Sequence, residues 1–191
     1  MYPETISSEL IEQLPLATFS GEIVEVKSNR EAVKALKELS QERLLGFDTE
    51  TKPSFTTQQS LHHKTALLQL ASANKAFLFR LPWCGINKHL IALLSNPEVL
   101  KVGAAIKDDV RGLMAYRTFK PAGFVDLQTL TESLGIKEKS VKKIAAIILN
   151  LRVSKGQQLS NWEHYDLSPA QCQYAALDAW ICREIYLKLK R

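Results

Sequence analysis

Long apolar runs, internal repeats and low-complexity segments are missing from this sequence of 191 residues. No stretch is apolar over transmembrane length, and the start is not a positively charged segment followed by an apolar one. No shift in composition marks a linker between two domains. We therefore expect an intracellular protein, located in the cytoplasm, that has no membrane partner.

Cysteine is also scarce. The three cysteines, Cys84, Cys172 and Cys182, are an odd number and lack the spacing of metal ligands. Their neighbours in the sequence are mostly apolar, which is typical of small buried side chains. The sequence therefore argues against a disulfide framework and against a zinc site.

The residues that are present describe a globular domain. The chain is 46% hydrophobic and 24% charged, and its length fits one domain of ordinary size. A net charge of +5 favours a polyanionic partner such as nucleic acid, although this signal is weak on its own. Residues 1–20 carry two prolines and no regular period, so we expect an extended N-terminal arm there and a single domain over residues 21–191.

The stretch Leu44–Glu50 is the most informative part of the chain. It is an apolar run of strand length that ends in Asp48 and Glu50, and Pro53 follows it. Because side chains alternate along a strand, the two acids share one face and Thr49 lies on the other. A pair of carboxylates that provides only oxygen ligands suits a hard divalent ion, Mg²⁺ or Mn²⁺. The alternative is an exposed strand end whose acids lie in water.

Strand and helix signals place this stretch in a mixed α/β sheet. Two apolar runs joined by Ala73-Asn74 predict a hairpin beside the acidic strand, which gives three antiparallel strands in a row. Farther along, strands alternate with helices, which favours parallel additions to the same sheet. The predicted strands span residues 22–26, 44–50, 65–72, 75–81, 99–105 and 123–126. One predicted helix begins after Ser28, which suits its N-cap position. Further helices are predicted over residues 88–94, 108–116, 127–134, 141–149 and 169 to the C-terminus. The last of these has its start signal at Ser168-Pro169.

Two adjacent aspartates lie in the predicted helix 108–116. The apolar residues of this helix form one stripe, and at 100° per residue Asp109 falls at the edge of the stripe while Asp108 points away from it. We therefore expect Asp109 to lean inward. The alternative is that both acids only stabilise the positive end of the helix dipole.

Tyr174 and Asp178 lie one turn apart on the last predicted helix, on a face that continues through Ile181 and Ile185. A carboxylate on a core-facing stripe is costly unless a cation or a hydrogen-bond donor pairs with it. An ion shared with the acids of residues 48 and 50 would provide that pairing. A local salt bridge at the start of the helix is the alternative.

These residues together resemble the three motifs of the DEDDy 3′-to-5′ exonucleases. The first is Phe47-Asp48-Thr49-Glu50, the second spans 102–109, and the third is Tyr174-Ala175-Ala176-Leu177-Asp178. The segments 159–162 and 167–169 are similar to the ribonuclease D and Werner-exonuclease branch of the family. The resemblance covers nearly the whole chain.

The resemblance implies a ribonuclease H-like mixed sheet of five to six strands, three antiparallel and then two parallel, flanked by helices. It implies an exonuclease that releases 5′-mononucleotides from the 3′ end of DNA or RNA. Because no helicase or nucleic-acid-binding segment follows in the sequence, we expect an exonuclease module standing alone. In the family mechanism two divalent ions, Mg²⁺ or Mn²⁺, take part in hydrolysis. The matching positions are Asp48, Glu50 and Asp178 for the first ion, Asp109 for the waters of the second, and Tyr174 for orienting the attacking water.

Candidate contacts to the substrate are less specific. A basic loop could contact the sugar-phosphate backbone of a nucleic acid, and one aromatic ring could stack on a base. The candidates are Thr49, Lys52, His62, His63, Lys64 and Trp162. The basic run from residue 137 to 143 also qualifies, but the pattern favours a solvated helix face for Lys142 and Lys143, and core packing is the commoner use of a tryptophan.

Two other functions remain open at this point. A catalytically silent module that binds nucleic acid would keep the fold, but it would gain nothing from converging carboxylates that face phosphates. A ribonuclease H-like endonuclease would share the sheet and the ions. The pair Tyr174 and Asp178 favours the exonuclease, and attack on a circular substrate separates the two activities.

Overall fold

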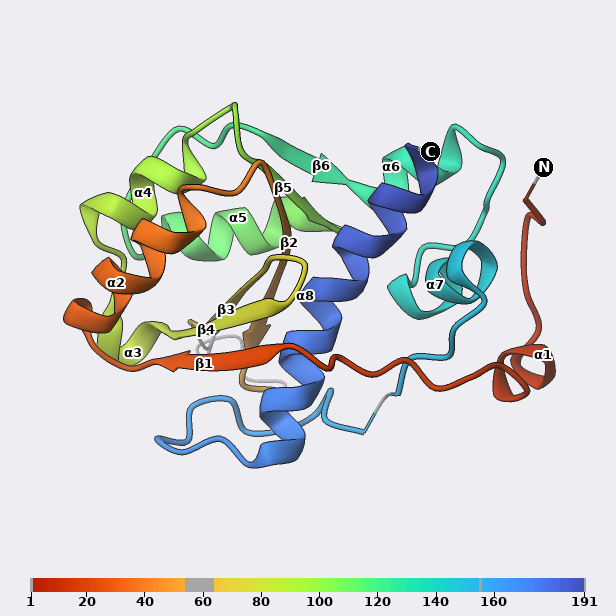
Figure 1. The fold of residues 1–191 in the computed structure, drawn as a ribbon, viewed down its shortest axis with the longest axis horizontal. Coiled ribbons are helices and arrows are strands. Elements are labelled where there is room, and N and C mark those ends of the chain that lie inside the picture. The colour runs from red at the N-terminus through yellow and green to blue at the C-terminus, as the bar shows by residue number, and fades with distance from the viewer. Residues whose placement is uncertain (1, 54–63, 155, 191) are drawn as a thin grey trace, which may run out of the picture.

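The computed structural model describes residues 2–53, 64–154 and 156–190, and these contain one mixed sheet of six strands with helices on both faces (Figure 1). The strand order across the sheet is β1-β4-β3-β2-β5-β6. The strands are β1 (Glu22–Val26), β2 (Leu44–Thr51), β3 (Thr65–Ala71), β4 (Lys75–Arg80), β5 (Leu100–Gly103) and β6 (Phe124–Asp126). The helices are α1 (Ser8–Glu12), α2 (Asn29–Leu39), α3 (Leu81–Cys84), α4 (Lys88–Leu94), α5 (Ile106–Met114), α6 (Leu127–Glu132), α7 (Val141–Leu149) and α8 (Pro169–Leu189).

The pairing of the strands confirms the sheet expected from the sequence. Strand β3 pairs antiparallel with both β2 and β4, while β5 and β6 add parallel to β2. The first strand, β1, lies at the far edge and pairs parallel with β4. The acidic strand β2 is therefore a central strand, flanked by β3 and β5.

The start of α5 differs from the prediction by two residues. Strand β5 ends at Gly103, and Ala105 adopts a left-handed conformation with a φ of 55°, so the helix begins at Ile106. The carboxylate of Asp126 accepts hydrogen bonds from the backbone nitrogens of Ala105 and Ile106, at 3.3 and 3.2 Å. A residue that is distant in sequence therefore sets this boundary, which local helix signals do not reveal.

The N-terminal arm is not entirely extended, contrary to the prediction. Ser7 accepts a hydrogen bond from the backbone of Leu10 and caps the short helix α1. Farther along, the arm pairs with the segment after α7, where the backbone of Ala17 donates to Arg152 and that of Arg152 donates to Pro15, both at 2.8 Å. The arm therefore lies against the body of the protein, close to α7 (Figure 1).

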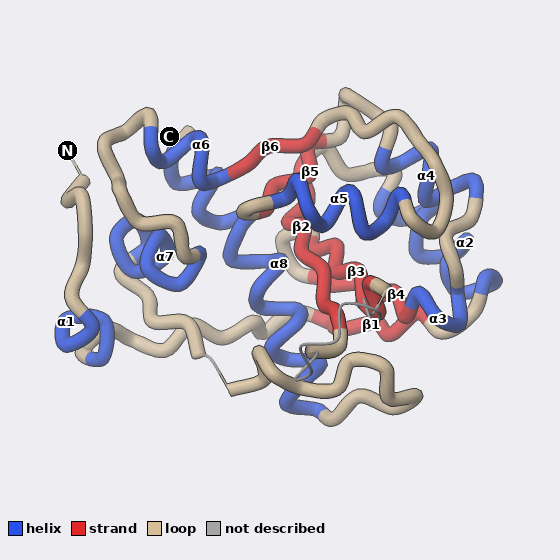
Figure 2. The backbone as a smooth tube through the Cα atoms, turned by 180° about the vertical axis from the view of Figure 1, so that it is seen from behind, coloured by secondary structure: helices blue, strands red, loops and turns tan. Residues whose placement is uncertain are grey.

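The two faces of the sheet bury different sets of side chains. Residues such as Phe47, Leu68 and Phe79 pack with α2, α4 and α5 on one face. On the other face α8 lies across β2, β3, β4 and β5 and packs with α7, as the two opposite views show (Figures 1 and 2). None of the helices in the described ranges combines the length and the apolarity needed to cross a membrane. All three cysteines are free thiols, and Cys84 and Cys182 are buried.

Helix α8 approaches β2 more closely than any side chain would allow. A Cβ atom placed on Gly46 would lie 1.8 Å from the carbonyl oxygen of Ala179, which is far inside van der Waals contact. Ala175, Ala176 and Ala179 are fully buried and give the helix a smooth surface at this contact. The glycine therefore fixes the distance between the strand and the helix.

We expect Gly46→Ala to lower the thermal stability. Overpacking in a core costs about 1–3 kcal/mol, and a clash with backbone belongs at the upper end of that range. For a chain of this size, that corresponds to a fall in melting temperature of roughly 5 °C or more. Gly156→Ala, where the nearest atom would lie at 3.5 Å, is the matched control. Equal melting curves for the two variants would show that α8 can move away from β2 at little cost.

Candidate active site

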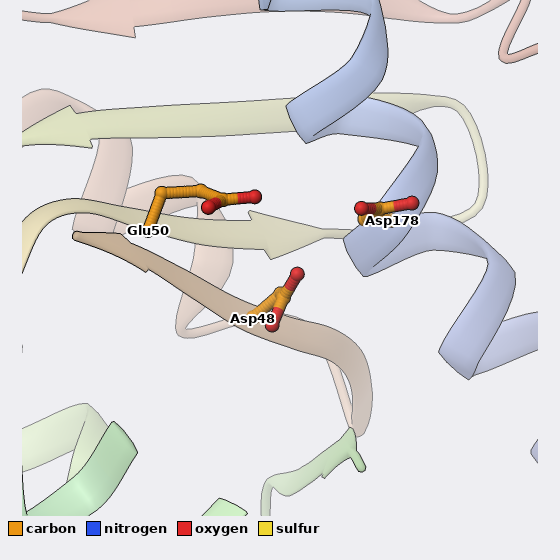
Figure 3. Close-up of side chains that lie close together, drawn as sticks. All are labelled: Asp48, Glu50 and Asp178. Atoms are coloured by element: carbon orange, nitrogen blue, oxygen red, sulfur yellow. The ribbon is translucent and has the colours of Figure 1, made fainter. Parts of the chain in front are cut away.

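Three carboxylates meet between β2 and α8. Asp48 and Glu50 lie on the same face of β2, as strand alternation predicts, and Asp178 faces them from the helix (Figure 3). Each carboxylate offers an oxygen, and these oxygens lie within 4.8 Å of one another. Because the ligands are all oxygens at short range, the cluster can hold a hard divalent ion.

The pKa values of all three carboxylates are raised above their ordinary values. Burial, followed by the charges of Asp178 and Glu50, raises the pKa of Asp48 well above its ordinary value. Burial and the charges of Asp178 and Asp109 raise the pKa of Glu50 to about 8. The pKa of Asp178 rises to about 6 because of burial, against the hydrogen bond from Tyr174 and the charge of Lys142. In the absence of a metal ion, the cluster therefore holds protons near neutral pH.

Tyr174 lies one turn before Asp178 and lines the same hollow as that carboxylate. Burial raises the pKa of the phenol, and the charges of Asp178 and Glu50 raise it further, so the hydroxyl is a neutral donor. The helix that carries both residues starts as predicted, with a capping box between Ser168 and Gln171 and Pro169 in the first turn.

Trp162 is a correction to the predicted substrate contacts. Its side chain is fully buried, so it is not exposed for stacking on a base. The ring lies 6.1 Å from that of Tyr174 and packs in the same small core cluster. The buried guanidinium of Arg80 donates to the backbone carbonyls of Trp162, His164 and Tyr165, which ties down the segment before α8. Trp162 therefore supports the tyrosine from within the core.

Asp109 and Asp108 separate as the helical phase predicts. Asp109 accepts a hydrogen bond of 2.6 Å from the hydroxyl of Thr49, and burial raises its pKa against the effect of that bond. Asp108 is exposed and pairs with Arg111 at 2.7 Å. Thr49 points to the opposite face of β2 from its two acidic neighbours, so Asp109 reaches the strand from the α5 side and lies outside the group of three carboxylates.

Asp126 is a residue of this region that sequence reasoning missed. Besides holding the start of α5, its carboxylate accepts from the backbone of Gln128 at 2.8 Å and caps α6. One side chain therefore positions the first turn of the helix that carries Asp109. An aspartate directly before a predicted helix was the signal for the α6 cap, but the contact to α5 has no signature in the sequence.

Lys142 belongs to the basic run named as a candidate from the sequence, but the solvated position that the pattern favoured for it is wrong. Its side-chain nitrogen is buried and lies 5.3 Å from the centroid of the Tyr174 ring. It borders the same hollow of about 260 Å³ as the three carboxylates, together with Ser140 and Gln158. The first turn of α7 is directed at the site, so the apolar stripe of the helix does not decide where this lysine points.

The other residues predicted to contact the substrate lie in different surroundings. Lys52 forms an ion pair of 3.3 Å with Glu163. Lys64 lies 5.5 Å from the centroid of the Tyr116 ring and lines a hollow of about 460 Å³ that also includes Thr49 and Asp109. His62 and His63 lie outside the described residues.

A mixed sheet in this strand order, with carboxylates of a central strand facing one on the last helix, defines a ribonuclease H-like nuclease class. A family model described as 3′-5′ exonuclease matches residues 23–191, and the chain belongs to this family. The family depends on divalent metal ions, and the three-carboxylate cluster fits that requirement.

Similar proteins agree with this assignment. The chain is 36% identical over 153 residues to the exonuclease 3′-5′ domain-containing protein 2 of Drosophila melanogaster, a match that covers 78% of this chain and 26% of that protein. It is 32% identical over 102 residues to the ribonuclease D of Haemophilus influenzae, covering 53% of this chain and 26% of the relative. These matches span only about a quarter of the length of either curated relative.

Solved structures confirm the ribonuclease H-like fold. The exonuclease domain of Nibbler from Aedes aegypti is similar with a TM-score of 0.77 and 22% identity, and the match covers 91% of each chain. The ribonuclease D of Escherichia coli has a TM-score of 0.78 and 19% identity over 90% of this chain and 44% of its own. At these identities the similarity establishes the fold.

We expect the ionisation of Glu50 to lower the free energy of unfolding of the metal-free protein as the pH rises. The folded-state pKa of about 8 lies above the ordinary value of 4.5, so the penalty for the charged form appears between these two values. In chelator, Glu50→Gln should therefore gain melting temperature relative to the parent as the pH goes from about 5 to about 8. A difference between the two proteins that does not change with pH would mean that this carboxylate is not destabilised in the fold.

Proposed function

We propose that this protein is a 3′-to-5′ exonuclease that hydrolyses phosphodiester bonds from the 3′ end of a nucleic acid and releases 5′-mononucleotides. The observation that carries the proposal is the group of Asp48, Glu50 and Asp178 with Tyr174 beside it, in a chain of the 3′-5′ exonuclease family. We further propose that residues 21–191 form one exonuclease domain and that residues 1–20 are an arm attached to it.

We assign two divalent ions, Mg²⁺ or Mn²⁺, to the site. Asp48, Glu50 and Asp178 would hold the first, because their oxygens converge. Asp109 would act on the second mainly through water, since it approaches from the other side of β2 and is engaged with Thr49. Bound ions of this kind make a hydroxide available at neutral pH and neutralise charge on the phosphate.

Tyr174 orients the attacking water in this proposal. Its raised pKa keeps the hydroxyl protonated, so it donates a hydrogen bond and does not remove a proton. The buried ring of Trp162 beside it limits its motion. A hydroxyl with one fixed position is suited to directing water toward a phosphorus atom.

Nucleic acid is the proposed substrate class. Similar proteins include enzymes named for RNA and for DNA: a ribonuclease D of Trypanosoma brucei has been solved in complex with RNA, and a DNA polymerase I of Aquifex aeolicus is 28% identical over 157 residues. Lys64 and Thr49 line the larger hollow beside Asp109, and we propose that they contact the sugar-phosphate backbone there. Lys52, His62 and His63 are further proposed contacts.

The proposal is tested with 5′-end-labelled DNA and RNA oligonucleotides, single-stranded and recessed, in Mg²⁺ and in Mn²⁺. We expect a ladder of products shortened from the 3′ end, 5′-mononucleotides in solution and no cleavage in excess chelator. A circular substrate should stay intact. Cleavage of the circle would indicate the ribonuclease H-like endonuclease, and the absence of any cleavage with ions present would indicate a silent binding module.

The two neighbouring aspartates give a matched pair of variants. We expect Asp109→Ala to lower kcat by about 10²-fold or more, which is the scale for removing one electrostatic group from an active site. Asp108→Ala should change kcat little, because it loses only an exposed ion pair with Arg111, worth at most about 1 kcal/mol. Single-turnover rates on a labelled oligonucleotide measure both. Equal losses in the two variants would remove Asp109 from the proposed site.

A further inference from the structure

Lys142 places a positive charge in the hollow that the three carboxylates line. Its nitrogen is buried, next to the ring of Tyr174. A buried ammonium group is costly unless negative charge surrounds it, and here the carboxylates provide that charge.

The neighbouring lysine shows that this position is specific. Lys143 follows directly in α7, but it is partly exposed and forms an ion pair of 3.1 Å with Glu138. Lys52, just after the end of β2, is engaged by Glu163 at 3.3 Å. Among the described residues, Lys142 is therefore the cation that lies within the hollow of the carboxylates.

We propose that Lys142 is a positioning residue of the exonuclease site: its ammonium group neutralises Glu50 and Asp178 before divalent ions bind, and it competes with those ions for the carboxylates. The inference rests on the proposed function of the cluster. A lysine carries its charge on a long flexible stem, so the ammonium group can leave the oxygens while α7 stays in place. An incoming divalent ion meets a like charge that must first move away, which lowers the affinity for the ion.

Two consequences follow for the protein without its ions. The three acids keep close to one another because one positive charge offsets part of their repulsion. The hollow also keeps its shape, since the side chain of Lys142 lines it and packs 5.3 Å from the centroid of the Tyr174 ring. The site is thus assembled before an ion arrives, at the expense of tighter ion binding.

The test compares Lys142→Met with Lys143→Met, and Lys142→Gln serves as a second variant in case the first does not fold. Melting is followed in chelator, and Mn²⁺ binding is measured by isothermal titration calorimetry without substrate. For Lys142→Met we expect a metal-free melting temperature several degrees below that of the parent and a dissociation constant for Mn²⁺ lower by about tenfold, as loss of a like charge at short range implies. Lys143→Met should match the parent in both measurements, and Lys142→Arg, which keeps the charge, should restore the melting temperature.

The outcomes separate this inference from the proposed function. If the parent binds no Mn²⁺ and Asp178→Asn binds none either, the metal site itself is wrong. If the parent binds Mn²⁺ and Lys142→Met binds it with the same or weaker affinity, the lysine is only structural and the inference is overturned. A lower melting temperature without a change in Mn²⁺ affinity would also limit Lys142 to a structural role and overturn the inference.

Discussion

The close contact between α8 and β2 is the constraint on which the rest of the structure depends. At Gly46 the strand meets the backbone of Ala179, and Asp178 is the residue immediately before that contact. The adjacent turn of helix therefore cannot lie farther from Asp48 and Glu50 than the strand allows. Backbone contact, which has few degrees of freedom, brings the carboxylates together in spite of their repulsion.

Apolar packing elsewhere in the fold offsets the destabilising effect of this group of carboxylates. Burial raises the pKa of Glu50 and of Asp178, and the charges of Asp178 and Asp109 raise the pKa of Glu50 further, so the charged carboxylates destabilise the folded state. The apolar face of the sheet toward α2 and α4 is packed with fully buried leucines and phenylalanines and carries no such cost. The opposite face combines an apolar core of its own, formed with α7 and α8, with the three carboxylates.

Local patterns in the sequence predicted much of this arrangement. Alternation along β2 placed Asp48 and Glu50 on one face, and helical phase separated Asp109 from Asp108, because both periods follow from backbone geometry alone. Contacts between distant segments were not predictable in this way. The bonds from Asp126 to the start of α5 and the position of Lys142 depend on how α6 and α7 pack, which no local period encodes. Trp162 was ambiguous because a tryptophan before a helix suits both a core and a surface.

The register of β2 limits which insertions and deletions this strand can tolerate during evolution. Phe47 and Thr49 face α5, whereas Gly46, Asp48 and Glu50 face α8. A slip of one residue would move the acids to the wrong face, bring a phenylalanine into the site and press a side chain against Ala179. Insertions or deletions in this strand would therefore damage folding and chemistry in a single event. Selection for a stable core and selection for the arrangement of the carboxylates therefore act on the same few positions of β2, so a change in one property would also change the other.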